Sequence, residues 1–149
     1  MEEVLTFIGV KMVTAVRMKS SMAAARGYRL NDSNPNVDGY EVTYPDGYSS
    51  WSPADVFEKA YLCLSEPTRI TEEDILNFMG EPKIQRIDQK TTLVSYETRT
   101  GFVQHEASSC VDPNNYNEEI GSRVARDRVM NKLWPCFGFV LQWARNGLK

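Results

Sequence analysis

Apolar and polar positions along the chain predict several short elements in the first sixty residues. Residues 8–18 form an apolar run that two basic residues punctuate, a pattern that favours a strand. A serine start, an alanine run and a following glycine predict a short helix at residues 20–27. Residues 39–44 alternate, a Pro-Asp-Gly turn follows, and extended structure resumes at residues 48–51, which predicts a β-hairpin. The Ser-Pro pair at residues 52–53 then opens a helix, with the serine as N-cap.

Turn-forming residues separate this part of the chain from a second pattern. Asn, Asp, Ser and Pro fill residues 31–36, which predicts a loop, and residues 65–68 are the best candidate for a boundary. Thr71 and Asp74 then have the spacing of a capping box, and the helix that they begin ends at Gly80. Three antiparallel strands follow, over residues 83–88, 91–98 and 101–108. We therefore expect two units, residues 1–66 and residues 67–149.

A long helix is predicted from residue 116 to residue 134, where Pro135 ends or kinks it. Its apolar positions spread around much of the circumference: residues 120, 124, 125, 129, 130, 133 and 134. Such a helix is usually covered on more than one side, and in a small chain the second cover is often another subunit. We therefore expect a homo-oligomer. Residues 136–144 form a last apolar segment, either helix or strand.

Together these elements predict an α+β fold. An antiparallel sheet packs against the long C-terminal helix, and a small β-hairpin/helix module precedes them. The chain has 149 residues, of which 42% are apolar and 25% charged, which is typical of a globular protein that buries a core. No apolar run is long enough to cross a membrane, and the acidic N-terminus lacks the features of a secretory signal.

Charge and cysteine content exclude several classes of site. The net charge of −3 gives no overall positive field for duplex nucleic acid, so an anionic ligand would need a local basic site. Three cysteines at wide spacings indicate reduced thiols in place of a disulfide framework. One histidine and the lack of a Cys-x-x-Cys motif leave no ligand set for a transition metal. We expect neither a metal nor a cofactor.

Four basic residues of the long helix are the candidates for a local basic site. Arg123 and Arg126 are three positions apart, whereas Arg128 and Lys132 are four positions apart on a different face. Paired guanidinium groups bind phosphate oxygens in a bidentate way. A structural role explains the same residues, because bases toward the C-terminal half complement the helix dipole and Asp127 can pair with Arg123.

The segment before this helix offers hydroxyl, amide and backbone N–H groups near a helix start, which suits an anion. Its members are Ser108, Ser109, Asn114 and Asn115. A strand end, a turn and an N-cap explain these residues without a ligand. Phe102 is either a core residue or a platform on which a nucleobase stacks.

His105 and Cys110 are of the residue types that act as catalytic base and nucleophile. The sequence shows no third residue that would orient the histidine, and Cys110 can equally be a small buried hydrophobe. Acidic residues at the helix starts are explained by the helix dipole, and no glycine-rich phosphate loop has a recognised spacing. We therefore expect no catalytic residues and no enzymatic activity.

Two stretches of the chain resemble phage proteins. The first is the pattern Tyr-x-Ser-Trp-Ser-Pro-x-x-Val-Phe-Glu-x-Ala-Tyr at residues 48–61, with the strand that precedes it. It is similar to a small module of tailed-phage and prophage proteins. Physically the module is a hairpin followed by a helix, so the resemblance implies kinship of fold and no mechanism.

The second stretch comprises residues 101–110, the pattern Pro-x-Asn-Tyr-x-Glu-Glu-Ile-Gly at residues 113–121, and Lys-Leu-Trp-Pro at residues 132–135. It resembles the first type of Thoeris anti-defence protein, a phage family. The resemblance implies a hexameric sponge in the host cytoplasm, which binds cyclic ADP-ribose isomers made by TIR enzymes, and cyclic oligonucleotides, at subunit interfaces without cleaving them. The implied ligand contacts are an aromatic residue, an amide and basic residues of the helix: Phe102, Asn114 or Asn115, Arg123, Arg126, Arg128 and Lys132.

We therefore expect a phage anti-defence protein that sequesters a host cyclic-nucleotide signal. Such a ligand needs paired cations, hydroxyl partners and stacking rings but no general base. The main alternative is a protein–protein interaction module whose tyrosine-rich N-terminal unit contacts a host factor. A third reading is a phosphodiesterase-like enzyme with His105 as its acid–base residue. Nucleic-acid binding ranks lower, because the arginines are local and the net charge is negative.

Overall fold

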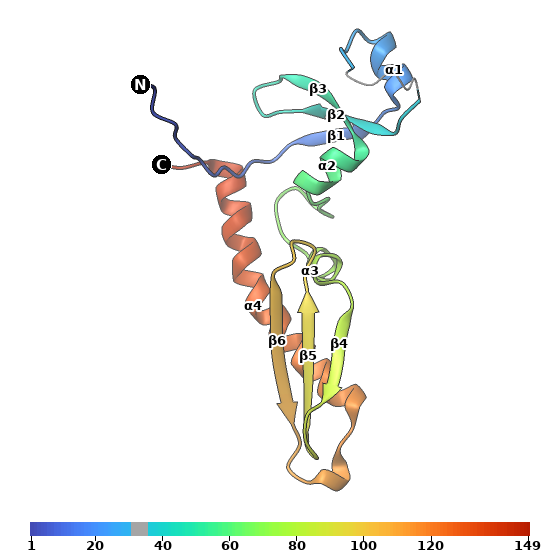
Figure 1. The fold of residues 1–149 in the computed structure, drawn as a ribbon, viewed down its shortest axis with the longest axis vertical. Helices are drawn as coiled ribbons and strands as arrows, with labels where there is room; N and C mark the ends of the chain where they lie inside the picture. Colours follow the sequence, from blue (N-terminus) through green and yellow to red (C-terminus); the bar gives the residue numbers. More distant parts are fainter. Residues whose placement is uncertain (31–35) are drawn as a thin grey trace. The chain divides into compact units, whose positions relative to one another are not determined.

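The computed structural model describes residues 1–30 and 36–149, and within them the chain forms two compact units. The first unit comprises Met1–Cys63 with Gln142–Lys149, and the second comprises Leu64–Leu141. Each unit contains a three-stranded antiparallel sheet (Figure 1). Of the loop expected at residues 31–36, only Asn36 belongs to the described residues.

The first unit is built on a sheet with the strand order β1-β2-β3. Its strands are β1 (Thr14–Arg17), β2 (Gly39–Thr43) and β3 (Ser49–Pro53), and its helices are α1 (Ser20–Ala25) and α2 (Ala54–Ala60). The expected hairpin and the two expected helices are confirmed. The strand expected at residues 8–18 forms only at Thr14–Arg17. Thr14 lies opposite Thr43, where β2 ends, so β2 offers no pairing for residues 8–13.

The turn between β2 and β3 closes where the sequence predicts. The N–H of Gly47 donates a hydrogen bond to the Tyr44 carbonyl (2.9 Å), and the N–H of Tyr48 donates one to the Asp46 carboxylate (3.0 Å). Gly47 adopts a φ of 90°, in the left-handed region that favours glycine. The Pro-Asp-Gly sequence therefore sets the length of the hairpin.

The start of α2 differs from the expected one. Ser52 lies opposite Tyr40 in the β2–β3 ladder, so β3 continues through Pro53. Pro53 takes the N-cap position of α2, and the helix start has no side-chain cap. The prediction of Ser52 as N-cap is therefore wrong, because cross-strand pairing holds this residue in the sheet.

The second unit begins with α3 (Glu72–Met79). The Thr71 hydroxyl accepts a hydrogen bond from the Asp74 N–H (3.3 Å), and the Asp74 carboxylate accepts one from the Thr71 N–H (2.8 Å). This reciprocal pair confirms the predicted capping box, and Gly80 ends the helix as predicted. The three expected strands are also confirmed, as β4 (Pro82–Arg86), β5 (Thr91–Glu97) and β6 (Val103–Ser109), in the order β4-β5-β6.

A 3-10 turn, η1 (Pro113–Asn115), precedes the long helix α4 (Glu118–Asn146). Of the two outcomes expected at Pro135, the helix end is wrong, and of the two readings of residues 136–144 the helical one is confirmed. Leu133, before the proline, is buried in the core, and the ring of Phe137, after it, meets the ring of Phe78 edge-on with 4.8 Å between centroids. Apolar packing on both sides of Pro135 offsets the one backbone hydrogen bond that a proline removes.

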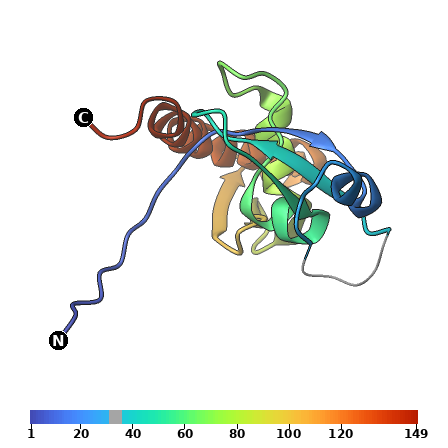
Figure 2. The same ribbon diagram turned by 90° about the horizontal axis from the view of Figure 1, so that it is seen from above.

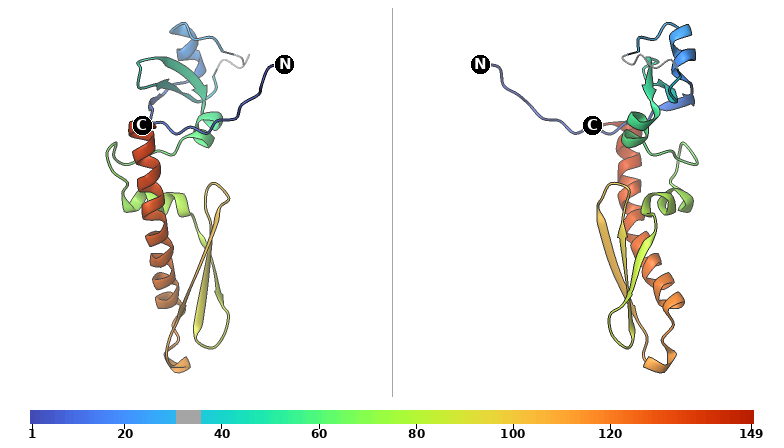
Figure 3. Two further views of the ribbon diagram at one scale, coloured as in Figure 1. Left: turned by 90° about the vertical axis from the view of Figure 1, so that its left-hand side faces the viewer. Right: turned by 45° about the vertical axis from the view of Figure 1, so that its right-hand side comes forward.

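The core of the second unit lies between α3, α4 and one face of the sheet (Figure 3). Side chains from all three parts contribute to it: Ile75, Met79, Val94, Tyr96, Ala125, Val129, Met130 and Leu133. An antiparallel sheet packed against a long C-terminal helix, with a small N-terminal hairpin/helix module, is the α+β fold that the sequence predicts.

Other apolar side chains of α4 stay outside this core. Ile120 is 51% exposed and Trp134 is 37% exposed. These residues belong to the set whose spread around the helix indicates a second cover. The homo-oligomer that would supply the cover stays a prediction.

Candidate functional site

Arg128 and Lys132 lie about one helical turn apart on α4, and both contact β6. Nη1 of Arg128 donates a hydrogen bond to the carbonyl oxygen of Ala107, and Nζ of Lys132 forms an ion pair with the Glu106 carboxylate. The side chain of Lys132 is 59% exposed, and Arg128 is exposed as well. We refer to Arg128 and Lys132 as the α4 cation pair.

Ser108 lies on the same face of the sheet as Glu106. In the β5–β6 ladder, Glu106 is opposite Val94 and Ser108 is opposite Thr92. Val94 belongs to the core under α4, and Thr92 is fully buried. Because directly opposed residues of antiparallel strands share a face, Ser108 faces the α4 side. The structure thus brings three of the predicted site residues, Ser108 and the α4 cation pair, to one side of β6.

Ser109 lies on the opposite face of the sheet. Side chains alternate along a strand, and the Ser109 hydroxyl shares a hydrogen bond with the Thr91 hydroxyl across the ladder (2.7 Å). The two adjacent serines that the sequence groups together therefore point to different sides.

The other two arginines of α4 lie on different sides of the helix. At about 100° per residue, Arg123 lies roughly 180° around the helix from Lys132. Arg123 is exposed. Arg126 pairs weakly with Asp127 (3.4 Å) and lies near the buried Tyr96, where burial raises the pKa of the tyrosine and the positive charge of Arg126 opposes that rise. The four basic residues are therefore not one cluster within the chain.

Phe102 lies at the far end of β6 from Ser109. Its side chain is 65% exposed, so it is not a core residue. Seven residues of extended strand, at about 3.3 Å each, separate the two positions by roughly 23 Å. A ligand held beside Ser108 does not reach the Phe102 ring of the same chain.

Asn114 and Asn115 lie in η1, just before α4. The Asp112 carboxylate accepts a hydrogen bond from the Asn114 N–H (2.9 Å), so the turn is capped by the chain itself. Glu118 and Glu119 occupy the first turn of α4 and compensate the helix dipole. This helix start therefore offers polar groups but no net positive field for an anion.

Sequence reasoning missed Arg86 and Tyr116 in this region. The guanidinium carbon of Arg86 lies 3.9 Å from the ring centre of Tyr116, and the Tyr116 hydroxyl accepts a hydrogen bond from buried Thr92 (3.0 Å). Glu106, the partner of Lys132, was missed as well. These contacts join residues far apart in the chain, so the spacing of residues along the sequence does not predict them.

His105 and Cys110 bond to different partners. Nδ1 of His105 lies 2.8 Å from the Ser95 hydroxyl on the neighbouring strand. The Cys110 thiol donates to the carbonyl of Asp112 (3.2 Å). The geometry gives no support to a nucleophile–base pair made of these two residues.

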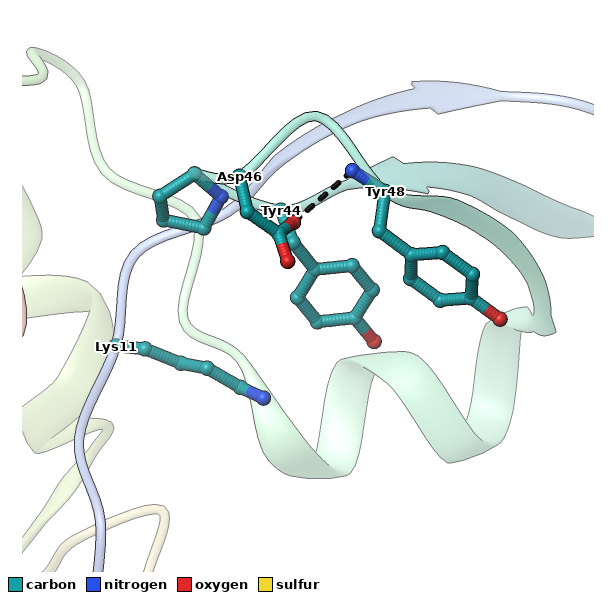
Figure 4. A pocket seen from close by; sticks show the side chains of 5 residues that line it. Lys11, Tyr44, Asp46 and Tyr48 are labelled. Atoms are coloured by element: carbon teal, nitrogen blue, oxygen red, sulfur yellow. Dashed lines mark hydrogen bonds between the residues drawn. The ribbon is translucent and has the colours of Figure 1, made fainter.

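The first unit has an aromatic surface and a pocket of its own. The ring of Phe57 packs against those of Tyr40 and Tyr61, with centroid distances of 4.6 and 4.8 Å. An open pocket of about 490 Å³ is shown in Figure 4. The Tyr44 and Tyr48 rings, 5.8 Å apart, line it, and Nζ of Lys11 lies 4.7 Å from the Tyr44 ring centre. Pro45 and Asp46 complete its lining.

Phosphate binding is the chemistry that the α4 cation pair offers. A guanidinium has five N–H donors, and the contact with Ala107 uses one of those of Arg128. The Lys132 side chain is 59% exposed whereas that of Glu106 is 17% exposed, and an ammonium has three N–H donors, so Lys132 can donate to a phosphate oxygen beside its contact with the carboxylate. Ser108 adds a hydroxyl donor on the same face.

Two negative findings concern residues 1–30 and 36–149. No helix there combines the length and the apolar character that a membrane crossing requires. No three His, Cys, Asp or Glu side chains are grouped so that they could hold a metal ion.

Comparison with known proteins relates the second unit to a phage family. Residues 70–144, half of the chain, match the model of a family described as phage protein (N4 Gp49/phage Sf6 gene 66). The chain has no significant match among curated proteins or solved structures. The matched segment contains α3, the β4-β5-β6 sheet and nearly all of α4. The chain therefore belongs to the phage protein (N4 Gp49/phage Sf6 gene 66) family.

Proposed function

We propose that this phage protein binds and sequesters a host cyclic-nucleotide immune signal without cleaving it. The ligand class is a cyclic ADP-ribose isomer made by a TIR enzyme, a cyclic oligonucleotide, or both. Membership of a phage family is consistent with a role against the host. The resemblance of residues 101–135 to Thoeris anti-defence proteins supports this ligand class.

The α4 cation pair is the observation that carries the proposal. Arg128 and Lys132 lie on one face of α4, next to the Ser108 side of β6, where Arg128 donates to a backbone carbonyl and the exposed Lys132 pairs with the half-buried Glu106 carboxylate. We assign a ligand phosphate to these three residues. Since an anion gains most where cations and hydroxyl donors converge, this is the place in the second unit where a negatively charged ligand is best held.

A nucleobase needs a stacking ring that this arrangement lacks within one protomer. Phe102 has the required exposure but lies roughly 23 Å along β6 from the serine end. We therefore propose that the site is completed between copies, with the phosphate on the α4 cation pair of one copy and the base on Phe102 of another. The exposed Ile120 and Trp134 of α4 are available for the contact between copies.

Calorimetry with matched variants tests this assignment. Arg128→Ala and Lys132→Ala should each weaken binding of the signal roughly ten- to hundredfold, because each removes a charge-assisted contact to phosphate. Arg123→Ala serves as control, since it removes an exposed arginine of the same helix on the opposite side. Loss of affinity in Arg123→Ala with full affinity in the other two variants would overturn the assignment.

The aromatic surface of the first unit favours a second function, binding of a host protein. Tyrosine rings are enriched at protein interaction surfaces, and those of Tyr44 and Tyr48 line this open pocket. This alternative predicts a host complex that survives charge reversal at Arg123, Arg126 and Arg128. Truncation of Tyr44 and Tyr48 to alanine would abolish that complex, as a pull-down from host extract can show.

A further inference from the structure

Residues 1–13 precede β1 as an extended segment without helix or strand (Figure 2), and we call them the N-terminal arm. Four large apolar side chains of the arm are strongly exposed: Val4 (92%), Leu5 (61%), Phe7 (84%) and Ile8 (81%). Single exposed apolar residues are ordinary, but four within five positions expose apolar surface on both sides of an extended segment, as an unpaired strand does. Val, Phe and Ile favour strands, so a strand edge suits these residues as a partner.

β1 offers such an edge in the same unit. It is an end strand of the β1-β2-β3 order, with β2 on one side. The N–H of Met18 donates to the Gly39 carbonyl (2.9 Å), which makes residues 18, 16 and 14 the ones that bond to β2. Odd-numbered residues of β1 therefore direct their N–H and C=O groups to the open side. Val16 of β1 is itself 64% exposed.

We propose that residues 3–9 of one copy add as an antiparallel strand to the open edge of β1 in a second copy. The exchange is mutual around a two-fold axis at Val10. An axis perpendicular to the joined sheet keeps each residue on its own face, so odd residues pair with odd and even with even. On the open edge of β1 the odd-numbered residues point their N–H and C=O groups outward, so odd-numbered residues of the arm can bond to them.

The chemistry of the opposed residues selects the register. When the pairing is centred on Val10, residues of opposite charge face each other, as do hydroxyl residues and apolar residues. The pairs are Glu3 with Arg17, Val4 with Val16, Leu5 with Ala15, Thr6 with Thr14, Phe7 with Val13, and Ile8 with Met12. Opposite charges and apolar pairs across strands stabilise a sheet, whereas like charges destabilise it.

The neighbouring registers are poorer. A pairing centred on Lys11 places this lysine opposite its own copy and Leu5 opposite Arg17. A pairing centred on Gly9 places Phe7 opposite Lys11 and leaves Glu3 opposite Ala15. The proposed partner is therefore a second copy of this chain, held by its first unit, and the proposal does not depend on the nucleotide ligand.

Cysteine cross-linking tests the register in the full chain. Cys63, Cys110 and Cys136 are first replaced by serine, and circular dichroism confirms the fold. Val10→Cys then places two cysteines across the axis with their Cα atoms about 4.5 Å apart, within the range that a disulfide spans. Gly9→Cys or Lys11→Cys alone leaves the two Cα atoms roughly 8 Å apart, which is too far.

The expected result is a covalent dimer with Val10→Cys and none with either flanking variant alone. A mixture of the two flanking variants should form a mixed dimer, because residue 9 lies opposite residue 11 in the proposed register. Equal cross-linking of all three single variants, or failure of the mixture to cross-link, would overturn the proposal.

Proline variants provide a second test that keeps the native cysteines. Phe7→Pro removes an N–H that faces the partner strand, and it lies in the arm, outside every strand and helix of its own chain. Thr6→Pro is the control, because its N–H faces away from the partner. Sedimentation should show loss of the dimerisation step in Phe7→Pro and its retention in Thr6→Pro. The same association state in both variants would contradict the pairing.

Discussion

Asp74 is a fully buried carboxylate at the start of α3. Its oxygens accept hydrogen bonds from the N–H groups of Ser65 (2.9 Å) and Thr71 (2.8 Å) and from the Ser65 hydroxyl (3.0 Å). Burial alone would raise the pKa of the Asp74 carboxyl, but these donors outweigh burial and hold the pKa below its ordinary value. The charged form is therefore the one that stabilises the fold.

The sign of this shift predicts how stability depends on pH. The pKa of the Asp74 carboxyl is lower in the folded chain than in the unfolded chain. Its contribution to the free energy of unfolding is therefore fully present above the pKa of the unfolded chain, and it disappears as the pH falls through the pKa of the folded chain. Asp74→Asn should lower the free energy of unfolding at pH 7 by about 1–3 kcal/mol, since an amide cannot accept all of these bonds. The deficit should shrink below about pH 4.

Urea unfolding at pH 7 and pH 3 measures this effect. Asp127→Asn is the matched control, because Asp127 is an exposed aspartate in the same unit, and it should change stability by less than about 0.5 kcal/mol. A deficit in Asp74→Asn that is the same at both pH values would contradict the role assigned to the charge.

At this scale the sequence predicts contacts between near neighbours. The spacing of Thr71 and Asp74 predicts the capping box, but no pattern in the sequence predicts that Ser65 adds two more hydrogen-bond donors to the Asp74 carboxylate. In the same way Lys132 is predicted as a surface cation, whereas its partner Glu106 comes from another element. Long-range partners depend on how the elements pack, which local spacing does not encode.

α4 approaches β5 closely at Gly121. A Cβ placed on Gly121 would lie 2.5 Å from the hydroxyl oxygen of Thr92. Thr92 is fully buried, and its hydroxyl already donates to Tyr116. The glycine is therefore required by the packing of helix on sheet and is not a weak point of the helix.

Two glycine variants of α4 separate packing from helix propensity. Gly121→Ala should destabilise the protein by roughly 1–3 kcal/mol, because the crowding outweighs the gain of about 1 kcal/mol in helix propensity. Gly138→Ala should stabilise it by about 0.5–1 kcal/mol, since nothing lies within 4 Å of an added Cβ there. Thermal unfolding of both variants measures the difference, and a stabilised Gly121→Ala would refute the close approach.

Most helices and strands follow from periodicity and turn chemistry, and the exceptions have physical causes. The sequence predicts that Pro135 ends or kinks the helix, and α4 continues past it because Leu133 and Phe137 make apolar contacts on either side. The strand expected at residues 8–18 lacks its first half because β2 is too short to pair with it. Ser52 is a good cap that the β2–β3 ladder keeps in the sheet.

For the whole molecule, the net charge of −3 makes any anion site a local one. The helical spacing of Arg128 and Lys132 predicts that they share a face, and the structure places both against β6. The same spacing rule separates Arg123 from them, and the length of β6 separates Phe102 from Ser108. Grouping all nine candidate residues into one site by sequence proximity therefore overestimates what a single chain can assemble.

The measurement that tests the central claim most directly is a titration followed by recovery of the ligand. Wild-type protein is titrated by calorimetry with cyclic ADP-ribose isomers and with cyclic di- and trinucleotides, the protein is then denatured, and the released ligand is analysed by chromatography. Sequestration predicts a saturable heat with at least one of these ligands and its recovery in chemically unchanged form. Absence of heat with every ligand, or recovery of a cleaved product, would contradict it.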